Sequence, residues 1–233
     1  MIIAMALAGG SGTRMGAELP KQFLKLGGRE IILYSIEAFL KSDKIDKVIC
    51  IVPQDYIGKT QQLLANNGIF APIIAGGADR NESLMNGIAF IEREYGLDDD
   101  TVILTHDAVR PFINERIIED NIKAMAECDA CDTCISATDT IIEGSGGYAV
   151  NMPERSNMFQ CQTPQTFKAK KLKALYESLS AREKLSLTDA GKIFFLKGEE
   201  VKIVEGSRDN IKITYPSDLP LAEQILKSRE NKA

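Results

Sequence analysis

The sequence predicts an α/β fold built on a doubly wound, mostly parallel β-sheet. Short apolar runs alternate with helical patterns along most of the 233 residues. Most of these runs are continuously apolar, as expected for parallel strands that are covered on both faces. A glycine-rich stretch follows the first run, at residues 7–16. Ligands of Rossmann-like folds bind at the carboxyl ends of such strands, so this stretch is the first candidate for a binding site.

Six strands and three helices are expected from these patterns. The strand ranges are 2–8, 47–52, 70–75, 101–106, 133–138 and 200–205. Helices are expected at 31–42, 79–95 and 114–127, where apolar residues recur at helical spacing. Gly96 would close the second helix, and Asn114 would cap the third. The alternation is typical of one doubly wound domain over residues 1–233.

One stretch interrupts this alternation. Residues 140–143 and 148–152 have the pattern of two short strands around the glycine-rich turn 144–147. We therefore expect a protruding β-hairpin arm, an excursion over residues 138–162. A two-stranded hairpin is marginally stable alone, so its apolar side chains are expected to bury against another surface. These side chains are Ile141, Ile142, Tyr148 and Val150.

Composition argues against several kinds of partner. The net charge of −5 excludes the basic surface that is typical of proteins binding nucleic acid or anionic membranes. No apolar stretch approaches the roughly 20 residues that span a bilayer. The N-terminus lacks the basic region and cleavage site of a secretory signal. We therefore expect a cytoplasmic protein that binds neither nucleic acid nor membrane.

Three of the five cysteines have the spacing Cys128-x-x-Cys131-x-x-Cys134. This spacing is similar to part of an iron–sulfur ligand run, which continues with a fourth Cys followed by Pro. Thr138 and Asp139 stand at those two positions. The segment leads into an apolar run, where free Cys behaves as a small hydrophobic residue. We expect these cysteines in the core rather than at a metal.

The glycine-rich stretch suits a phosphate-binding loop, because glycines let backbone N–H groups approach a phosphate closely. From Gly10 the spacing is G-x-G-x-x-x-G, one residue longer than the dinucleotide fingerprint, and no Lys-Ser or Lys-Thr follows as in a P-loop. A nicotinamide-dependent oxidoreductase would also need an acidic residue at the end of its second strand, where this chain has Val52-Pro53-Gln54. Arg14 and Lys21 place two cations near the loop, although most Arg and Lys side chains are simply solvated.

These residues resemble a known family. Residues 7–16, followed by Pro20-Lys21-Gln22, are similar to the signature of sugar-phosphate nucleotidyltransferases, and more narrowly of the cytidylyltransferases that act on polyol phosphates. Four further stretches agree in order, namely 76–83, 106–112, Gln162-Thr163-Pro164-Gln165 and 209–216. The resemblance covers nearly the whole chain. It implies a fold of the nucleotide-diphospho-sugar transferase type, CTP and a polyol phosphate as substrates, and Mg²⁺ as cofactor.

Two branches of this family differ in the acceptor of CMP. One acts on 2-C-methyl-D-erythritol 4-phosphate in isoprenoid synthesis. The other converts ribitol 5-phosphate to CDP-ribitol for teichoic acid and related cell-surface polymers. Residues 80–87 and 187–193 resemble the second branch, because the isoprenoid enzymes usually read Thr-Asp-Glu or Thr-Asp-Asp and then Ala-Ser where this chain has Thr188-Asp189-Ala190-Gly191-Lys192. We expect ribitol 5-phosphate as the acceptor, with the erythritol derivative as the alternative.

The resemblance also implies roles for individual residues. The implied catalytic residues are Arg14, Lys21, Arg155 and Lys212. The implied nucleotide-binding positions are Leu7, Ala8, Gly9, Gly10, Gly12, Arg80, Asn81, Glu82, Ser83, Leu84, Met85, Asn86 and Ala108. The implied acceptor-binding positions are Arg110, Arg155, Thr188 and Lys212. It further implies a homodimer in which the arm grips a second subunit, so that Arg155 of one chain joins Lys212 of the other.

Asp107 lies just after the predicted strand 101–106, and His106 is the last residue of that strand. A carboxylate there can hold Mg²⁺ together with a triphosphate, and an ion pair with Arg110 is the structural alternative. We expect His106 to be packed or hydrogen-bonded rather than a ligand. For the start of the helix at 79–95, helix capping is likewise the alternative, and Asp79, Asn81 or Ser83 could each supply the cap.

The expected chemistry explains why the chain has a single His. A phosphate monoester has its second pKa near 6 and is largely dianionic at neutral pH, so it attacks without a general base. The remaining task is to bring two anions together and absorb developing charge, which Arg and Lys side chains perform. A CTP-binding regulatory protein without catalysis would be expected to lack Arg14 or Lys21.

Overall fold

The computed structural model describes residues 1–10 and 19–231. Its main sheet has seven strands in the order β11-β7-β10-β6-β1-β4-β5. They are β1 (Ile2–Leu7), β4 (Lys47–Val52), β5 (Ile73–Ala75), β6 (Val102–Asp107), β7 (Ala130–Ser136), β10 (Phe159–Lys168) and β11 (Lys202–Glu205). The pairings in this sheet are parallel except those of β10, which runs antiparallel to β6 and β7. The expected mostly parallel sheet is confirmed.

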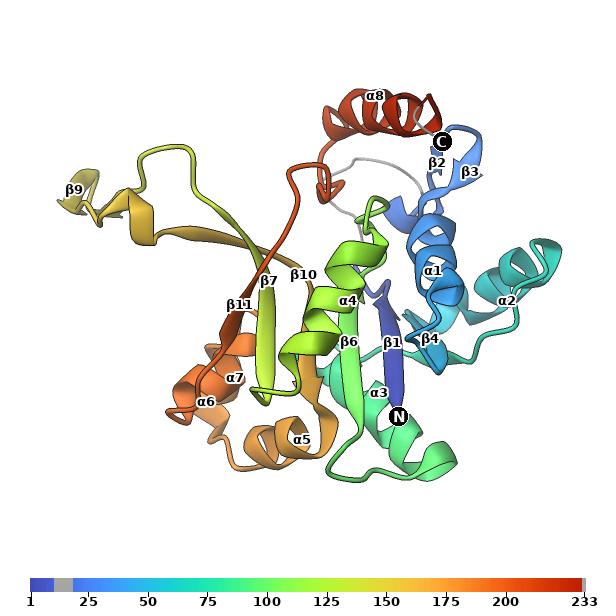
Figure 1. The fold of residues 1–233 in the computed structure, drawn as a ribbon, viewed down its shortest axis with the longest axis horizontal. Coiled ribbons are helices and arrows are strands. Elements are labelled where there is room, and N and C mark those ends of the chain that lie inside the picture. The colour runs from blue at the N-terminus through green and yellow to red at the C-terminus, as the bar shows by residue number, and fades with distance from the viewer. Residues whose placement is uncertain (11–18, 232–233) are drawn as a thin grey trace.

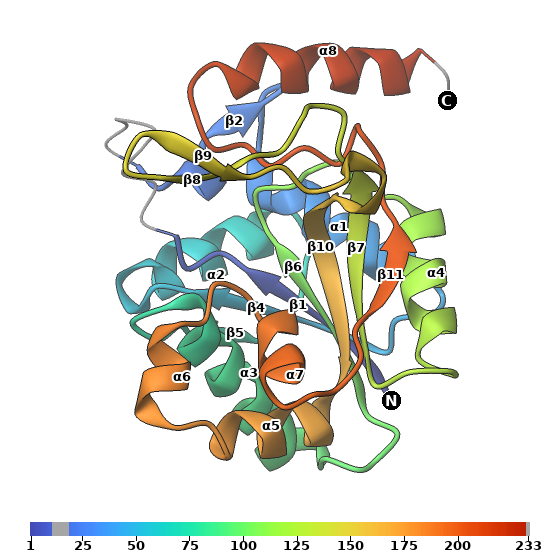
Figure 2. The ribbon, with the colours of Figure 1, turned by 90° about the vertical axis from the view of Figure 1, so that its left-hand side faces the viewer.

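Helices cover both faces of this sheet (Figures 1 and 2). One face packs against α1 (Ile31–Lys41), α2 (Ile57–Asn66) and α4 (Glu115–Ala124), and the other against α3 (Arg80–Tyr95), α5 (Ala169–Glu177) and α7 (Gly191–Leu196). Strand β1 shows why its sequence is continuously apolar. Ala4 and Ala6 belong to the first core, while Ile3 and Met5 belong to the second. Since both faces are buried, neither set of side chains can be polar.

Further elements surround this sandwich. A short helix, α6 (Ala181–Leu185), precedes α7, and two-residue strands β2 (Lys25–Leu26) and β3 (Arg29–Glu30) form a small ladder. Helix α8 (Asp218–Glu230) packs with Leu26 and Ile213 on a third apolar cluster. No helix in the described ranges has the length and apolar character that crossing a membrane would require.

The sequence interpretation missed β10 and the helices α2, α5, α6, α7 and α8. Strand β10 was missed because its residues, FQCQTPQTFK, are largely polar and include a central proline. Proline removes a ladder hydrogen bond and is normally excluded from inner strands. Here the register shifts between Cys161 and Gln165, and this irregularity accommodates Pro164. Strand β5 also begins later than expected, at Ile73.

The arm is present and projects from the body (Figure 1). Strands β8 (Glu143–Ser145) and β9 (Tyr148–Asn151) pair antiparallel in a sheet of their own. The first arm strand was expected at 140–143 but lies at Glu143–Ser145, so only Glu143 was placed correctly. The chain returning from the arm enters β10 at Phe159, before the expected end of the excursion at residue 162. Within the described residues the arm's apolar side chains stay exposed, at 80% for Tyr148, 57% for Val150 and 55% for Ile142. Their burial against another surface stays a prediction.

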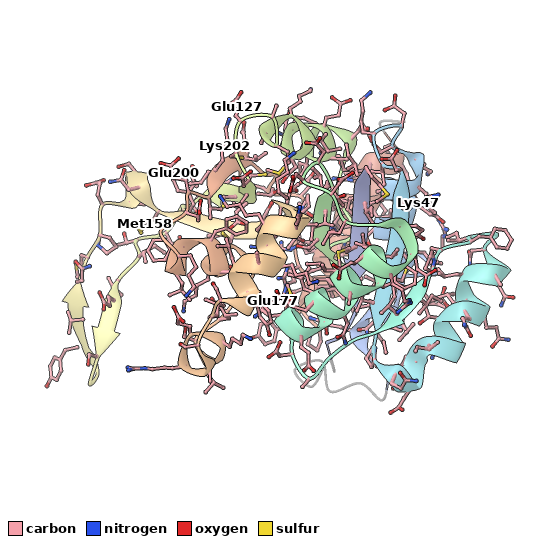
Figure 3. All side chains as sticks on the ribbon, turned by 90° about the horizontal axis from the view of Figure 1, so that it is seen from below. Lys47, Glu127, Met158, Glu177, Glu200 and Lys202 are labelled. Carbon is pink, nitrogen blue, oxygen red and sulfur yellow. The ribbon has the colours of Figure 1, made fainter. Side chains whose placement is uncertain are left out.

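Strand β11 forms one edge of the sheet, beside β7, which carries Cys131 and Cys134. Lys202 of β11 forms an ion pair with Glu127, which lies beside it in Figure 3. Cys131 and Cys134 are buried, as expected for core cysteines, whereas Cys128 is half-buried. All five cysteines are free thiols.

Candidate functional site

A pocket opens at the carboxyl ends of β1 and β6, the edge where ligands of doubly wound sheets bind. Its volume is about 360 Å³. Five segments that are distant in the sequence meet there: the end of β1, the 3₁₀-helix η2 (Lys21–Phe23), the start of α3, the turn after β6, and the segment between β11 and α8 that carries Lys212. The lining residues are Leu7, Ala8, Gly9, Gly10, Lys21, Gln22, Gly77, Ala78, Asp79, Arg80, Ser83, Asp107, Val109 and Lys212.

The start of α3 is held by hydrogen bonds that leave its first turn facing the pocket. Asp79 caps the helix, because its Oδ1 accepts from Glu82 N at 2.8 Å. The Glu82 carboxylate accepts in turn from Ala78 N at 2.7 Å. Ser83 Oγ donates to Asp79 O at 2.7 Å and accepts from Gly77 N at 2.9 Å. A helix N-terminus with free backbone donors attracts phosphate.

Asp107, the last residue of β6, is the centre of a charge cluster. Its carboxylate lies 2.7 Å from Lys212 Nζ, 3.5 Å from Arg80 Nε and 3.8 Å from Arg110 Nε. Burial alone would raise the pKa of Asp107, but Arg80, Lys212 and Arg110 outweigh burial and hold its pKa well below the usual range. The carboxylate is therefore ionised, and three cations around one anion leave positive charge for an anionic ligand.

Two guanidinium nitrogens of this cluster have no hydrogen-bond partner among the described residues. They are Arg80 Nη1 and Arg110 Nε, and both atoms are buried. Leaving a buried donor unpaired costs about 1–3 kcal/mol. Such donors are typical of a site whose missing acceptors are ligand oxygens, here those of phosphate groups.

Lys21 and Gln22 connect three parts of the pocket. Gln22 Nε2 donates to Ala8 O at 2.6 Å, and Lys21 Nζ donates to Ile213 O at 3.0 Å. The second bond ties η2 to the segment that carries Lys212. Ile213 is buried and Ile211 is half-buried, as expected for the neighbours of Lys212, although this segment is not a strand.

The pocket therefore gathers eight of the residues that the family resemblance implied, together with Asp107, the candidate metal ligand. The eight are Leu7, Ala8, Gly9, Gly10, Lys21, Arg80, Ser83 and Lys212. Gly12 and Arg14 lie outside the described residues. Asp79, expected only as a possible helix cap, also lines the pocket, as do Gln22, Gly77, Ala78 and Val109, which were given no role; all five stand within the stretches that carried the resemblance.

Other implied nucleotide-binding residues do not line the pocket: Asn81, Glu82, Leu84, Met85, Asn86 and Ala108. Leu84 is fully buried in the core beneath α3. Asn86 Nδ2 donates to Ala75 O at 3.3 Å, and Ala108 N donates to Leu7 O at 2.9 Å. Consecutive helix residues point in different directions, so only positions three or four apart share a face. On α3 those positions are Arg80 and Ser83.

The implied acceptor-binding residues are only partly brought together. Arg110 is buried behind the pocket, where its Nη1 donates to Asn210 O at 2.8 Å. Thr188 is exposed in the loop before α7. Arg155 begins the 3₁₀-helix η4 (Arg155–Asn157) at the root of the arm, and its Nη1 donates to Thr138 O at 3.3 Å. Figure 3 shows the arm reaching away from the body near Met158.

The donor set at Asp107 allows one kind of metal site. In the described part of the chain no three metal-ligating side chains form a group. Mg²⁺ is commonly held by one or two carboxylates together with substrate phosphates and water. A lone carboxylate therefore fits Mg²⁺ when a nucleotide supplies the other oxygens. Lys212 Nζ lies 2.7 Å from Oδ2 and Arg80 Nε lies 3.5 Å from Oδ1, so Oδ1 has the longer cation contact and is the more available oxygen.

His106 is packed and hydrogen-bonded, as expected. Its Nε2 lies 3.0 Å from Arg110 O, and its ring packs edge-on against Phe39. Burial lowers the pKa of His106 to about 4, so the ring is neutral at pH 7.

A second buried carboxylate, Asp132 of β7, was missed by the sequence interpretation because it stands in an otherwise small and apolar run. Its Oδ1 accepts from Gln165 Nε2 at 2.8 Å. Burial raises the pKa of Asp132 to about 6, and nearby Asp189 acts in the same direction. Gly191 lies against this carboxylate, and a Cβ at that position would stand 2.5 Å from Asp132 Oδ2.

Comparison with known proteins identifies the family. A sequence model of the IspD family, described as 2-C-methyl-D-erythritol 4-phosphate cytidylyltransferase, matches residues 2–228. The chain belongs to the IspD family. It is therefore a CTP-dependent cytidylyltransferase, and the enzyme class expected from the sequence is confirmed.

Individual relatives agree with this assignment. A ribitol-5-phosphate cytidylyltransferase of Lactiplantibacillus plantarum is 44% identical over 232 residues, covering 98% of this chain and 100% of that protein. The crystal structure of 4-diphosphocytidyl-2C-methyl-D-erythritol synthase from Anaerococcus prevotii is 28% identical, covers 97% of this chain and 96% of its own, and superposes with a TM-score of 0.82. The 2-C-methyl-D-erythritol 4-phosphate cytidylyltransferase of Thermus thermophilus shares the fold, with 24% identity, coverage of 97% and 100%, and a TM-score of 0.76.

The raised pKa of Asp132 makes a prediction for stability. A carboxyl whose pKa is higher in the folded state, about 6 here, destabilises the fold as the pH rises from its unfolded pKa to its folded pKa, and the loss is complete above the folded pKa. Wild type should therefore lose stability relative to Asp132→Asn as the pH rises from about 4 to 6, and Asp132→Asn should be more stable at pH 7 by roughly 2–3 kcal/mol. Urea unfolding at several pH values measures this difference. The exposed Asp43→Asn variant controls for loss of one charge, and an equal stability of Asp132→Asn and wild type at pH 7 would contradict the prediction.

Proposed function

We propose that this chain transfers CMP from CTP to ribitol 5-phosphate, giving CDP-ribitol and pyrophosphate. The 44% identity with the L. plantarum ribitol-5-phosphate cytidylyltransferase, along the length of both chains, is the observation that carries this acceptor. The resemblance of residues 187–193 to the ribitol branch supports it, since the other branch usually has alanine where this chain has Gly191. Gly191 also fits its surroundings, because a Cβ there would stand 2.5 Å from Asp132 Oδ2.

The proposed reaction joins two anions. A phosphate oxygen of the acceptor attacks the α-phosphorus of CTP, a new P–O bond forms, and the bond to pyrophosphate breaks. The dianionic phosphate needs no general base, and neutral, buried His106 is hydrogen-bonded elsewhere. The side chains therefore contribute by binding, orienting and neutralising charge.

Each part of the pocket takes one task in this proposal. The backbone of residues 7–10 and the start of α3 would hold the nucleotide and its phosphates. Lys21 would stabilise charge that develops on the reacting phosphate, together with Arg14 from the loop. Lys212, which lines the pocket, would bind the acceptor phosphate, and Arg110 behind it would add positive charge and an unpaired Nε.

We further propose that Asp107 holds Mg²⁺ jointly with the triphosphate of CTP. The single carboxylate and its more available Oδ1 support this role. When bound, the ion would neutralise phosphate charge and orient the nucleotide.

The arm supports a homodimer. Its apolar side chains are exposed in the single chain, and Arg155 at its root does not line the pocket. A two-fold partner would cover these side chains and place Arg155 beside the partner's acceptor site, since a two-fold interface contributes both arms equally. We further propose that the protein is cytoplasmic. Its product, CDP-ribitol, would be used for teichoic acid or another cell-surface polymer.

A panel of acceptors tests the substrate. Ribitol 5-phosphate, 2-C-methyl-D-erythritol 4-phosphate, other pentitol phosphates and glycerol phosphate are assayed with CTP for pyrophosphate release, with Mg²⁺ and with excess chelator. We expect the highest kcat/KM for ribitol 5-phosphate and no turnover under chelation. A preference for the erythritol derivative would overturn the acceptor, and full activity under chelation would overturn the role of Mg²⁺.

Lys21→Met should reduce turnover by roughly a hundred- to a thousandfold, because one preorganised donor to transition-state charge is worth about 3–4 kcal/mol. Methionine keeps the apolar stem that η2 buries but removes the buried bond from Nζ to Ile213 O, so the melting temperature should fall by a few degrees while the fold is kept. Lys25→Met, at an exposed position four residues away, is the matched control. A folded Lys21→Met variant with nearly normal kcat would show that Lys21 has no catalytic role.

Complementation tests the shared site. Arg155→Ala and Lys212→Ala should each be inactive alone, but every mixed dimer would contain one intact site and one doubly defective site. Random pairing of equal amounts makes half of the dimers mixed, so about a quarter of the wild-type sites should return. If mixed dimers are confirmed by mass and the mixture is as inactive as its parents, the two residues do not act across chains.

A further inference from the structure

The segment Gln162-Thr163-Pro164-Gln165 contributed to the resemblance but lines no part of the pocket. It lies in β10, between β6 and β7, at the shift in register. Its polar side chains are buried, with exposures of 7% for Gln162, 4% for Thr163 and 1% for Gln165. Buried polar side chains are costly unless they are paired, so their hydrogen bonds show what the segment does.

The hydroxyl of Thr163 joins two residues of the adjacent strand. Asp107 N donates to Thr163 Oγ1 at 3.1 Å, and Thr163 Oγ1 lies 3.0 Å from His106 Nδ1. His106 Nε2 lies 3.0 Å from Arg110 O, which can only accept, so Nε2 carries the proton and Nδ1 is an acceptor. The Thr163 hydroxyl therefore donates to His106 while it accepts from Asp107.

This hydroxyl replaces a missing backbone partner. The ladder between β6 and β10 ends at the pair Thr105 and Gln165. Beyond that pair the shift in β10 carries its backbone out of register, and Thr163 Oγ1 takes the acceptor position for Asp107 N. The turn that follows, residues 107–110, is thus held at its first residue by Thr163 and at its last residue through His106.

The backbone of Thr163 connects to the other charged segment. Asn210 Nδ2 donates to Thr163 O at 2.8 Å, and Asn210 O accepts from Arg110 Nη1 at 2.8 Å. Lys212, two residues later, forms the ion pair with Asp107 at 2.7 Å. Thr163 is thus hydrogen-bonded to the backbone of Asp107 directly and to Arg110 through Asn210. Asn210 also fixes the segment that carries Lys212.

We propose that Thr163 is a positioning residue for cytidylyl transfer, and that its hydroxyl holds Asp107 and Arg110 in their reactive arrangement through the Asp107 backbone and His106. The inference rests on the proposed roles of Asp107 and Arg110. A displacement of the order of 1 Å can cost about a hundredfold in rate, so one lost link in this chain of hydrogen bonds is enough to slow the reaction.

The test compares two substitutions of one residue. Thr163→Val has the same shape but no hydroxyl, and we expect kcat to fall by roughly 10- to 100-fold while the KM for CTP changes less than about threefold. Thr163→Ser keeps the hydroxyl and should retain kcat within about threefold. Thr166→Val is the matched control, because Thr166 lies in the same strand, is buried, and donates to Asn121 Oδ1 at 3.0 Å. It should lower stability without lowering kcat.

A second pair of variants covers the case in which Thr163→Val does not fold. Asparagine can keep only the bond from Thr163, near the position of His106 Nδ1, whereas glutamine can keep only the bond to Arg110 O, near Nε2. Each variant therefore breaks one link between Thr163 and Arg110, and both should lower kcat. Equal kcat in Thr163→Val and wild type, or equal losses in Thr163→Val, Thr163→Ser and Thr166→Val, would overturn the proposal, and so would wild-type kcat in both His106 variants.

Asp107→Asn, measured in parallel by pyrophosphate release with the best acceptor of the panel, separates this inference from the proposed function. If Asp107→Asn loses activity and Thr163→Val does not, only the positioning role fails. If Asp107→Asn keeps full activity, the site assignment fails and the positioning role fails with it. A preference for another acceptor would leave the role of Thr163 intact.

Discussion

The ionised carboxylate of Asp107 is the interaction on which the rest of the site depends. Arg80, Arg110 and Lys212 come from α3, the turn after β6 and the C-terminal segment, and they converge within 3.8 Å of this one side chain. Cations placed so close in a partly buried site repel one another strongly. Asp107 offsets that repulsion. The three cations in turn hold the pKa of its carboxyl well below the usual range, so the carboxylate stays ionised although it is buried. Without the anion, the three cations would repel one another across this edge of the sheet with nothing among these side chains to offset the repulsion.

This arrangement prepares the site before any substrate arrives. The cations are already gathered, and two of their nitrogens lack partners among the described residues. Fixed positive groups that need no reorganisation are what stabilises phosphoryl charge during transfer. Because the attacking phosphate is already an anion, the site needs charge and geometry rather than a proton acceptor. The one histidine of the chain has a structural role instead, because it links the backbone carbonyl of Arg110 to the hydroxyl of Thr163.

Strand β10 connects the site with the arm. It is the antiparallel strand in the middle of a parallel sheet, and it carries the chain back from the arm into the layer beside β6. Its shift in register accommodates Pro164 and turns Thr163 toward Asp107. One element therefore both anchors the arm that supports dimerisation and lies behind the charged cluster. Asp132 and Gln165, paired at 2.8 Å on the same two strands, extend this polar layer toward Gly191.

The sequence by itself determined the fold class and most of the charged residues of the site. Continuously apolar runs such as residues 47–52 report burial on both faces, and helical spacing reports one buried face, so both can be recognised locally. Only the tertiary structure decided which residues of the α3 motif face the pocket, because helix geometry selects Arg80 and Ser83 and turns Leu84 into the core. Strand β10 and buried Asp132 also needed the structure. Polar residues and a proline are accepted in an inner strand when partners from distant segments satisfy them, as Asn210 and His106 do for Thr163. Those partners lie 47 and 57 residues away along the chain, and a local pattern carries no information about contacts at that separation.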